Sequence, residues 1–267
     1  MGRRLGIIAS SGEIPSLIQK KASEKGSTCV VAAIEGQAER SVLEDIELIQ
    51  WFQVGDIQRI VSYFKTNGVS SVILAGKIDP RVIYDKTQSD LTALRILDSG
   101  KDKTPTSIIE KVIFFFEKQG LAVIDPTPFI LSYFCEKGTL THTQPSKEME
   151  LDIVFGWEIA RNIADSDIGQ TVVVKDRAIV AVEGMEGTDE AIKRGGRLAG
   201  RGTTVVKVSR MSQDPRVDLP AVGLTTVKSL VAADGSVLCF EAGRMPFFQR
   251  QEAISLADSH GITIIAK

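Results

Sequence analysis

The sequence contains little histidine and cysteine. Its 267 residues include two histidines, His142 and His260, and three cysteines. A zinc site built from clustered histidine and cysteine ligands is therefore excluded, and neither histidine lies in a nucleophile motif that would indicate a Ser-His-Asp triad. The cysteines, Cys29, Cys135 and Cys239, lie far apart in apolar surroundings. This pattern indicates buried thiols in a reducing compartment, and we expect a cytoplasmic protein.

Long apolar runs and a large net charge are also missing. No segment approaches the roughly 18 apolar residues that a membrane-spanning helix needs, and the apolar run near the N-terminus is too short for a signal peptide. The 32 basic and 34 acidic residues give a net charge of −2, which argues against nucleic-acid binding through a bulk electrostatic field. The 43% of hydrophobic and 25% of charged residues are typical of a globular protein with a substantial core.

The first half alternates short apolar runs with helical stretches, a pattern typical of a parallel sheet covered by helices. Asp56 is the expected N-cap of a helix whose apolar residues recur at helical spacing, and Gly68 follows its C-terminus. We therefore expect a Rossmann-like α/β domain over residues 1–134. Its expected strands are 5–10, 28–34, 48–52, 69–76 and 121–124, and its main helices are 15–25, 57–67 and 104–118.

A polar segment without apolar periodicity, residues 135–148, is predicted to be the domain linker. The C-terminal domain, residues 149–267, is expected to be α/β with a mixed sheet, and a cleft is expected between the two domains. Its expected helices are 149–164, 189–200, 219–233 and 250–260. A hairpin is expected at 171–183, and further strands at 203–209, 236–240 and 262–266.

Two loops of the N-terminal domain follow expected strands. Ser11 and Gly12 lie in "LGIIASSGEIP", and Gly76 and Lys77 lie in "LAGKIDPR", which also contains Arg81. Such loops can bring backbone N–H groups and a cation against an anion at the carboxyl edge of a parallel sheet. Tight turns with solvated charges are an equally good interpretation. The first loop lacks G-x-G-x-x-G, which disfavours a nicotinamide-dependent oxidoreductase.

The stretch "VEGMEGTDEAIKRGG" gathers acidic residues between an expected strand and an expected helix. Thr188 and Asp189 form a favourable helix N-terminus by capping and dipole criteria. Capping does not explain Glu183, Glu186 or Arg194. Ligand contact and helix capping are therefore both kept as interpretations, because one residue can serve both.

The stretch "SQDPRVDLPAVG" places Asp214 and Asp218 four residues apart on a proline-containing loop. Carboxylates of this kind bind Mg²⁺ together with substrate phosphate oxygens. The alternative is that Asp218 is an N-cap with Pro220 in the first helical turn. Since histidine and cysteine sites are excluded, an enzyme of this composition would use carboxylates, a hard metal ion and Lys or Arg charges. That combination suits phosphoryl chemistry.

Several motifs together resemble the LpxI family, the UDP-2,3-diacylglucosamine pyrophosphatases. They are "DIGQTVVV", "AVEGMEGTDEAIKR" and "QDPRVDLPAVGLTTV", supported by "LGIIASSGEIP", "VILAGKIDPR" and "GTLTHTQPS" in the same order. The resemblance implies two domains and Mg²⁺-dependent hydrolysis of the substrate's diphosphate to UMP and 2,3-diacylglucosamine 1-phosphate (lipid X), a step of lipid A biosynthesis. It further implies that water attacks the β-phosphorus. The sequence departs from the family where "ASSGEIP" lacks a second glycine and where Asp79 replaces a basic residue.

Carried onto this chain, the resemblance implies that Asp214 or Asp218 holds Mg²⁺ and organises the attacking water. Asp214 is slightly favoured, because Asp218 already has an explanation as an N-cap. The partner is a lipid-linked UDP-sugar, and peripheral contact with the inner membrane and a homodimer are compatible with it. A non-catalytic nucleotide-sugar or lipid-binding protein is the alternative. The expected substrate-binding residues are Ser11, Gly12, Gly76, Lys77, Glu186, Gly187, Thr188, Asp189, Arg194, Lys207, Gln213, Arg216 and Thr225.

Overall fold

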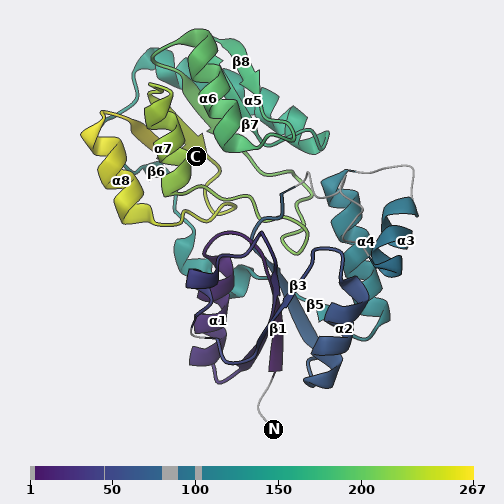
Figure 1. Ribbon diagram of the computed structural model, residues 1–267. Helices are drawn as coiled ribbons and strands as arrows, with labels where there is room; N and C mark the ends of the chain where they lie inside the picture. The colour runs from purple at the N-terminus through teal and green to yellow at the C-terminus, as the bar shows by residue number, and fades with distance from the viewer. Residues whose placement is uncertain (1–3, 45, 80–89, 100–103) are drawn as a thin grey trace. The chain divides into compact units, whose positions relative to one another are not determined.

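The computed structural model describes residues 4–44, 46–79, 90–99 and 104–267, and it divides into two compact units (Figure 1). Unit 1 comprises Met1–Ile130 and Asp214–Asp218, and unit 2 comprises Leu131–Gln213 and Leu219–Lys267. Residues 135–148 therefore fall within unit 2, and their role as a linker stays a prediction. The segment Asp214–Asp218 groups with unit 1 although its neighbours in the chain belong to unit 2.

Unit 1 is built on a parallel sheet of five strands in the order β3-β2-β1-β4-β5. This order reverses direction between β1 and β4, as in Rossmann-like folds. The expected fold of the N-terminal domain is confirmed. Its elements are β1 (Arg4–Ala9), α1 (Ile14–Glu24), β2 (Thr28–Ile34), a 3₁₀ turn (Arg40–Val42), β3 (Ile49–Phe52), α2 (Ile57–Thr66), β4 (Ser71–Ala75), α3 (Leu91–Asp98), α4 (Pro105–Lys118), β5 (Ala122–Val123) and a 3₁₀ turn (Thr127–Phe129).

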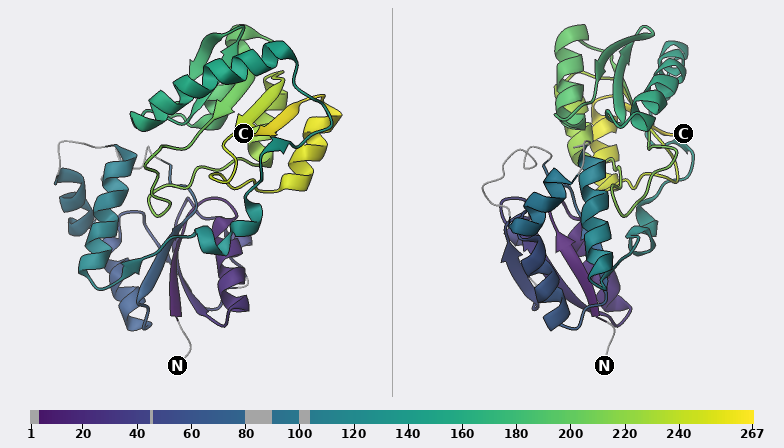
Figure 2. Two further views of the ribbon diagram at one scale, coloured as in Figure 1. Left: turned by 180° about the vertical axis from the view of Figure 1, so that it is seen from behind. Right: turned by 90° about the vertical axis from the view of Figure 1, so that its right-hand side faces the viewer.

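Helices cover both faces of this sheet (Figures 1 and 2). The buried faces of α2, α3 and α4 share one apolar cluster with side chains of β2, β3 and β4, whereas α1 packs separately against β1 and β2. Asp56 occupies the N-cap position of α2 as expected, but its carboxylate accepts from the Gln53 N–H at 2.9 Å. The Asp90 carboxylate instead accepts from the N–H groups of Gln58 in α2 and Ala93 in α3, both at 2.8 Å. One aspartate thus satisfies donors in the first turns of two helices.

Unit 2 contains a sheet of six strands in the order β6-β11-β10-β9-β7-β8. Strands β9, β10 and β11 are parallel, whereas β6 and β7 run antiparallel to their neighbours and β8 pairs antiparallel with β7. The expected mixed sheet is confirmed. The elements are a 3₁₀ turn (Leu131–Tyr133), β6 (Gly138–Thr139), α5 (Lys147–Asp165), β7 (Thr171–Lys175), β8 (Ala178–Val182), α6 (Thr188–Ala199), β9 (Thr204–Lys207), α7 (Leu224–Ala232), β10 (Val237–Phe240), α8 (Arg250–Ser259) and β11 (Thr263–Ala266).

Alternation along the central strands divides the core of unit 2 into two layers. Val172 and Val174 of β7 pack on the side of α5, together with Val206 of β9. Val173 and Val205 point to the opposite side, where α6, α7 and α8 supply the apolar partners. Helices therefore cover both faces of the sheet (Figure 2).

One expected helix begins later than predicted. The helix expected at 219–233 starts at Leu224, and its N-cap is Gly223. The preceding residues are instead held in an extended conformation, because the Val222 N–H donates to the Pro246 carbonyl and the Phe248 N–H donates to the Val222 carbonyl. The prediction that Asp218 caps this helix is therefore wrong, since Asp218 lies well before the helix begins.

Candidate functional site

The two loops nominated in unit 1 lie side by side at the carboxyl ends of β1 and β4. Ser11 and Lys77 form an antiparallel bridge in which each backbone N–H donates to the other's carbonyl at 3.2 Å. The Ser11 hydroxyl also donates to the Lys77 carbonyl at 2.5 Å. Strand order reverses between β1 and β4, and open α/β sheets bind ligands at such a switch point.

Gly76 allows this close approach. Its φ is +91°, and a Cβ atom there would lie 2.4 Å from the Ser11 carbonyl oxygen. Gly12 and Lys77 are exposed beside it, so backbone groups and one ammonium face solvent at this edge. The structure thus brings Ser11, Gly12, Gly76 and Lys77 together. Arg81, the other cation considered for this edge, lies outside the described residues.

In unit 2, polar residues gather at the edge where β8, β9 and β10 end. Glu183 directly follows β8, Lys207 is the last residue of β9, and Glu241 directly follows β10. Helices α6 and α7 each follow a strand that ends at this edge, so their N-termini begin there. Partial positive charge at helix N-termini favours anions. This second strand edge is therefore also suited to an anionic ligand.

A buried polar chain connects three of these elements. The Lys207 ammonium donates to the Thr188 hydroxyl at 2.9 Å and to the Ala221 carbonyl at 3.0 Å. The Thr188 hydroxyl donates to Glu183 Oε1 at 2.8 Å, and Glu183 Oε2 accepts from the Gln170 N–H at 3.1 Å. Lys207 and Thr188 are each 8% exposed. This chain therefore joins the first turn of α6 to the segment that follows the Asp214–Asp218 motif.

The acidic residues around the start of α6 pair with other residues of unit 2. Gly187, with φ of +83°, is the N-cap of α6, so the hydroxyl of Thr188 does not cap that helix as expected. Arg194 donates to Glu186 Oε1 at 2.5 Å and to the Val182 carbonyl at 2.8 Å. Hydrogen bonds from Arg194 and from two backbone N–H groups outweigh partial burial and lower the pKa of Glu186. Asp189 accepts from the Ser229 hydroxyl of α7 at 3.1 Å.

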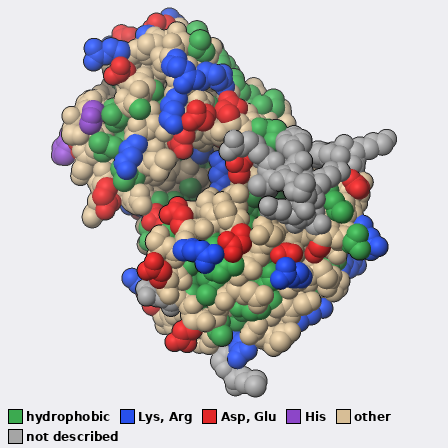
Figure 3. Space-filling view, viewed as in Figure 1, with side chains coloured by type: hydrophobic (Ala, Val, Ile, Leu, Met, Phe, Trp, Pro, Cys, Tyr) green, Lys and Arg blue, Asp and Glu red, His purple; other side chains and the backbone are tan. Residues whose placement is uncertain are grey.

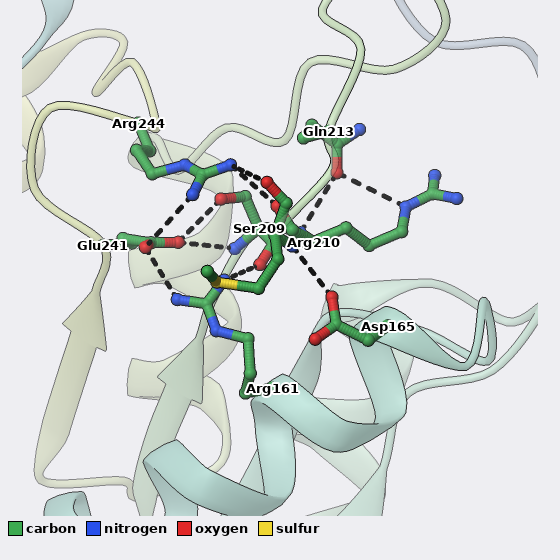
Figure 4. A network of polar contacts seen from close by, with 8 residues as sticks. Arg161, Asp165, Ser209, Arg210, Gln213, Glu241 and Arg244 are labelled. Atoms are coloured by element: carbon green, nitrogen blue, oxygen red, sulfur yellow. Dashed lines mark hydrogen bonds and ion pairs between the residues drawn. The ribbon is translucent and has the colours of Figure 1, made fainter.

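A second polar network surrounds the loop after β9 (Figure 4), and of its labelled members only Gln213 is among the expected site residues. Glu241 accepts from the Ser209 backbone N–H at 2.9 Å and from its hydroxyl at 2.6 Å. Arg161 of α5 donates to Glu241 Oε1 at 2.7 Å and also to the Ser209 carbonyl. Gln213 Oε1 accepts from the Arg210 backbone N–H at 3.2 Å. Charged or polar residues directly after buried strands were the available signal for Glu241 and Ser209, whereas Arg161 is indistinguishable in sequence from a solvated helix residue.

Asp214 forms a bidentate ion pair with Arg216. The Arg216 Nη2 donates to Asp214 Oδ2 at 2.8 Å, and the Arg216 backbone N–H donates to Oδ1 at 2.9 Å. Hydrogen bonds from Arg216 lower the pKa of Asp214 despite its partial burial. Within unit 1, Arg216 also pairs with Glu117 of α4 at 3.1 Å, and Val217 packs against the apolar cluster of that unit. Asp214–Asp218 is thus an ordered turn.

Asp214 and Asp218 carry the carboxylate oxygens that magnesium prefers, but those of Asp214 are bound to Arg216 in this arrangement. Mg²⁺ takes one or two carboxylates together with water and phosphate oxygens. Both carboxylate oxygens of Asp214 are occupied by Arg216. Over residues 4–44, 46–79, 90–99 and 104–267, no three His, Cys, Asp or Glu side chains are grouped so that they could hold a metal ion. Asp214 as arranged therefore has no open carboxylate oxygen for the ion.

The reason for favouring Asp214 over Asp218 as the metal ligand no longer holds, because Asp218 is not a helix cap. Asp214 and Asp218 are therefore equally good candidates for the metal ligand.

Thr225, another nominated residue, is exposed in the first turn of α7.

The three cysteines are buried, and one face of the surface carries charges of both signs. All three cysteines are buried free thiols, and burial raises the pKa of Cys239 to about 12, which disfavours the nucleophilic thiolate. On the face shown in Figure 3, Lys and Arg side chains are interspersed with Asp and Glu side chains. Among the helices that the structure describes, none combines the length and the apolar character needed to cross a bilayer.

Comparison with known proteins identifies one curated relative over the whole chain. The UDP-2,3-diacylglucosamine pyrophosphatase LpxI of Caulobacter vibrioides is 27% identical over 274 residues, covering 98% of this chain and 97% of the relative. Similar solved structures include WbmH of Bordetella bronchiseptica with NAD⁺, at 17% identity, covering 43% of this chain and 35% of that chain, with a TM-score of 0.27. Another is UDP-glucose 4-epimerase of Brucella ovis with NAD, at 12% identity, covering 53% and 40%, with a TM-score of 0.28. At these scores the structural likeness supports no functional argument.

The two halves of the chain each match a domain of one family. The LpxI N-terminal domain matches residues 4–133, and the LpxI C-terminal domain matches residues 136–265. The order is that of the two units, and together the matches span nearly the whole chain. The protein therefore belongs to the LpxI family.

Proposed function

We infer that this protein hydrolyses the diphosphate of UDP-2,3-diacylglucosamine to UMP and 2,3-diacylglucosamine 1-phosphate, a step of lipid A biosynthesis. The observation that carries this inference is the match of both LpxI domains, in order, to residues 4–133 and 136–265. It is supported by the curated pyrophosphatase that aligns with 98% of the chain. The sequence disfavours a zinc site of histidine and cysteine ligands and a Ser-His-Asp triad. The carboxylates and cations that are present suit phosphoryl chemistry.

The reaction breaks one phosphorus–oxygen bond and forms one. The oxygen of water bonds to the β-phosphorus, the bond from the β-phosphorus to the bridging oxygen breaks, and that oxygen leaves on the α-phosphate as UMP. The protons of water pass to solvent or to a carboxylate. Since the charge lies on phosphoryl oxygens throughout, the protein's main contribution is positioning and charge stabilisation.

We propose that the two strand edges bind the anionic parts of the substrate. In unit 1, the exposed ammonium of Lys77 and the loop at Ser11, Gly12 and Gly76 suit a phosphate or the nucleotide. In unit 2, the partly exposed guanidinium of Arg194 lies near the N-terminus of α6, where an anion is favoured. Contact of the remaining nominated residues with the substrate is likewise a proposal. They are Glu186, Gly187, Thr188, Asp189, Lys207, Gln213, Arg216 and Thr225.

We also propose that hydrolysis requires Mg²⁺ and that Asp214 or Asp218 binds it. The support is the type of donor and the charge of the diphosphate, which Mg²⁺ would help to neutralise. Binding through Asp214 requires the Arg216 guanidinium to leave its two oxygens.

The activity test uses the purified chain with UDP-2,3-diacylglucosamine, with Mg²⁺ and then with EDTA. Release of UMP supports the enzyme, and its loss in EDTA supports the metal requirement. Binding without release would instead identify a non-catalytic binding protein. In ¹⁸O-labelled water, attack at the β-phosphorus places the label in the sugar phosphate, whereas label in UMP contradicts that direction of attack.

Variants separate the two aspartates. We expect Asp214→Ala or Asp218→Ala to abolish turnover and to leave folding and substrate binding largely intact. Glu150→Ala, an exposed acidic residue of α5, is the matched control and keeps activity. Circular dichroism and equilibrium dialysis with the substrate check folding and binding. Full activity in both aspartate variants would remove the proposed metal role.

Peripheral membrane contact and a homodimer are further proposals. The acylated substrate in the name of the curated relative supports the membrane contact. Co-sedimentation with anionic vesicles tests the membrane contact, and light scattering of the purified chain tests the dimer.

A further inference from the structure

The loop between β9 and the Asp214–Asp218 motif is held by side chains. It runs from Val208 to Gln213 and contains no helix or strand. A loop of this kind is ordered only where its backbone N–H and C=O groups are hydrogen-bonded. Its hydrogen-bond partners therefore determine how well the loop is ordered as far as Gln213, its last residue.

Glu241 binds the start of this loop. Its Oε2 accepts from the Ser209 backbone N–H at 2.9 Å and from the Ser209 hydroxyl at 2.6 Å. Its Oε1 accepts from Arg161 Nη2 at 2.7 Å, and Arg161 Nη1 donates to the Ser209 carbonyl. The backbone donor and acceptor of Ser209 are thus both fixed by one ion pair, as Figure 4 shows.

Further side chains bind the next two residues of the loop. Arg244 Nη2 donates to the carbonyl of Arg210 at 2.7 Å and to that of Met211 at 3.2 Å. Asp165 of α5 accepts from the Met211 N–H at 2.8 Å. Gln213 Oε1 accepts from the Arg210 N–H at 3.2 Å. Side chains of unit 2 therefore bind the backbone from 209 to 211 at six points.

The burial of this network marks Glu241 as its central group. Glu241 is 8% exposed and Ser209 is fully buried. A carboxylate buried to this extent is costly unless it is paired and hydrogen-bonded. A buried ion pair whose two members both bind the backbone of Ser209 is explained if it fixes the position of that loop.

We propose that Glu241 is a positioning residue, which acts through Ser209 to hold the loop that ends at Gln213 and so to place Gln213, a nominated substrate contact, for hydrolysis. Arg161 orients the Glu241 carboxylate and binds the same serine. This inference rests on the proposed pyrophosphatase function. It assigns Glu241 no contact with the substrate.

The first test measures hydrogen exchange in the absence of substrate. In Glu241→Gln, we expect the Ser209 and Met211 amides to exchange at least tenfold faster, while amides in the centre of β10 stay protected. Glu24→Gln is the matched control, since Glu24 is half-exposed and pairs with Lys21 on α1. This test does not depend on activity, so it still evaluates the network if the proposed function fails.

The second test measures turnover of UDP-2,3-diacylglucosamine. We expect Glu241→Gln to lower kcat on the order of 100-fold, the effect of displacing a reactive group by about 1 Å, and to change KM less than threefold. Arg161→Lys keeps the positive charge but loses the paired N–H groups of the guanidinium, and it should retain more activity than Arg161→Met. Glu24→Gln should match the unmodified protein.

Three results would overturn the proposal. One is unchanged exchange at Ser209 and Met211 in Glu241→Gln. Another is a folded Glu241→Gln with unchanged kcat. The third is a rise in KM at unchanged kcat, because that result places Glu241 in substrate binding. Absence of turnover in the unmodified protein would instead contradict the proposed function.

Discussion

Replacement of Lys207 with methionine tests the buried chain that joins two motifs of unit 2. The change keeps a long unbranched side chain and removes the ammonium. That ammonium donates to the Thr188 hydroxyl at 2.9 Å and to the Ala221 carbonyl at 3.0 Å, and Lys207 is 8% exposed. We expect a folded protein with reduced stability of unit 2.

The magnitude follows from the contacts. Hydrogen bonds from a charged donor contribute about 1.5–3 kcal/mol each, and methionine removes both. Methionine also avoids the cost of burying an ammonium, which offsets part of this loss. Removing one partner of a buried ion pair costs about 3–5 kcal/mol. Lys207 reaches Glu183 only through the Thr188 hydroxyl. We therefore expect the free energy of unfolding to fall by the lower end of that range, about 3 kcal/mol.

Urea denaturation at pH 7 measures this loss. The chain has two tryptophans, Trp51 in β3 and Trp157 in α5, so a Trp51→Phe background reports on unit 2 through Trp157. Lys193→Met, at an exposed ion pair on α6, is the matched control and should leave the midpoint unchanged.

A loss below about 1 kcal/mol would refute the reasoning, because surface substitutions alone produce changes of that size. Combining Lys207→Met with Thr188→Val provides a second criterion. Since both residues belong to one chain of hydrogen bonds, we expect their effects to be non-additive by about 0.5–3 kcal/mol. Simple additivity would show that the chain does not act as a unit.

Three further predictions concern single features. Gly76→Ala should lower the melting temperature clearly more than Gly12→Ala, because both have positive φ but only at Gly76 would the Cβ meet backbone, at 2.4 Å; equal shifts would contradict this. Asp152→Ala should cost about 1–3 kcal/mol in urea denaturation, because it leaves two turn N–H groups after β7 without their acceptor; an unchanged midpoint would exclude that role. Despite burial, hydrogen bonds lower the pKa of Glu241, so its stabilisation should be present above its ordinary pKa and lost as pH falls through the lowered value; a Glu241→Gln deficit that does not shrink as the pH is lowered below the ordinary value would argue against it.

Apolar periodicity predicted most elements of both units. In the helix α2, the spacing of Ile57, Ile60, Val61 and Phe64 predicted one buried face, and all four side chains are buried. Strands such as Thr28–Ile34 were predicted to the residue because their apolar runs end at turn residues. The sequence of each element predicts its type, because the residues that become buried recur with the period of a helix or of a strand.

Contacts between distant segments explain the failures. Asp218 and Pro220 satisfy the local rules for a helix start, yet pairing of Val222 with the segment at Phe247 keeps the chain extended until Gly223. Local capping rules contain no information on a partner that far along the chain.

The candidate site was predictable in part. Lys207 was nominated as a phosphate contact, and its burial and its bonds to Thr188 and Ala221 could not be read from the strand sequence. Glu241 directly follows β10 and Arg161 lies on α5, and only the fold of unit 2 brings them to the same serine. Spacing along the chain cannot reveal such a pair.

The position of β11 has a consequence for the order of folding. This strand lies between β10 and β6, with Ile265 opposite Thr139 and Cys239. The sheet of unit 2 therefore closes only when segments from opposite ends of that unit meet, and closing such long loops slows folding. Until then the apolar edge of β10 is unpaired and can associate with other chains. We expect aggregation during refolding to begin at this edge of unit 2.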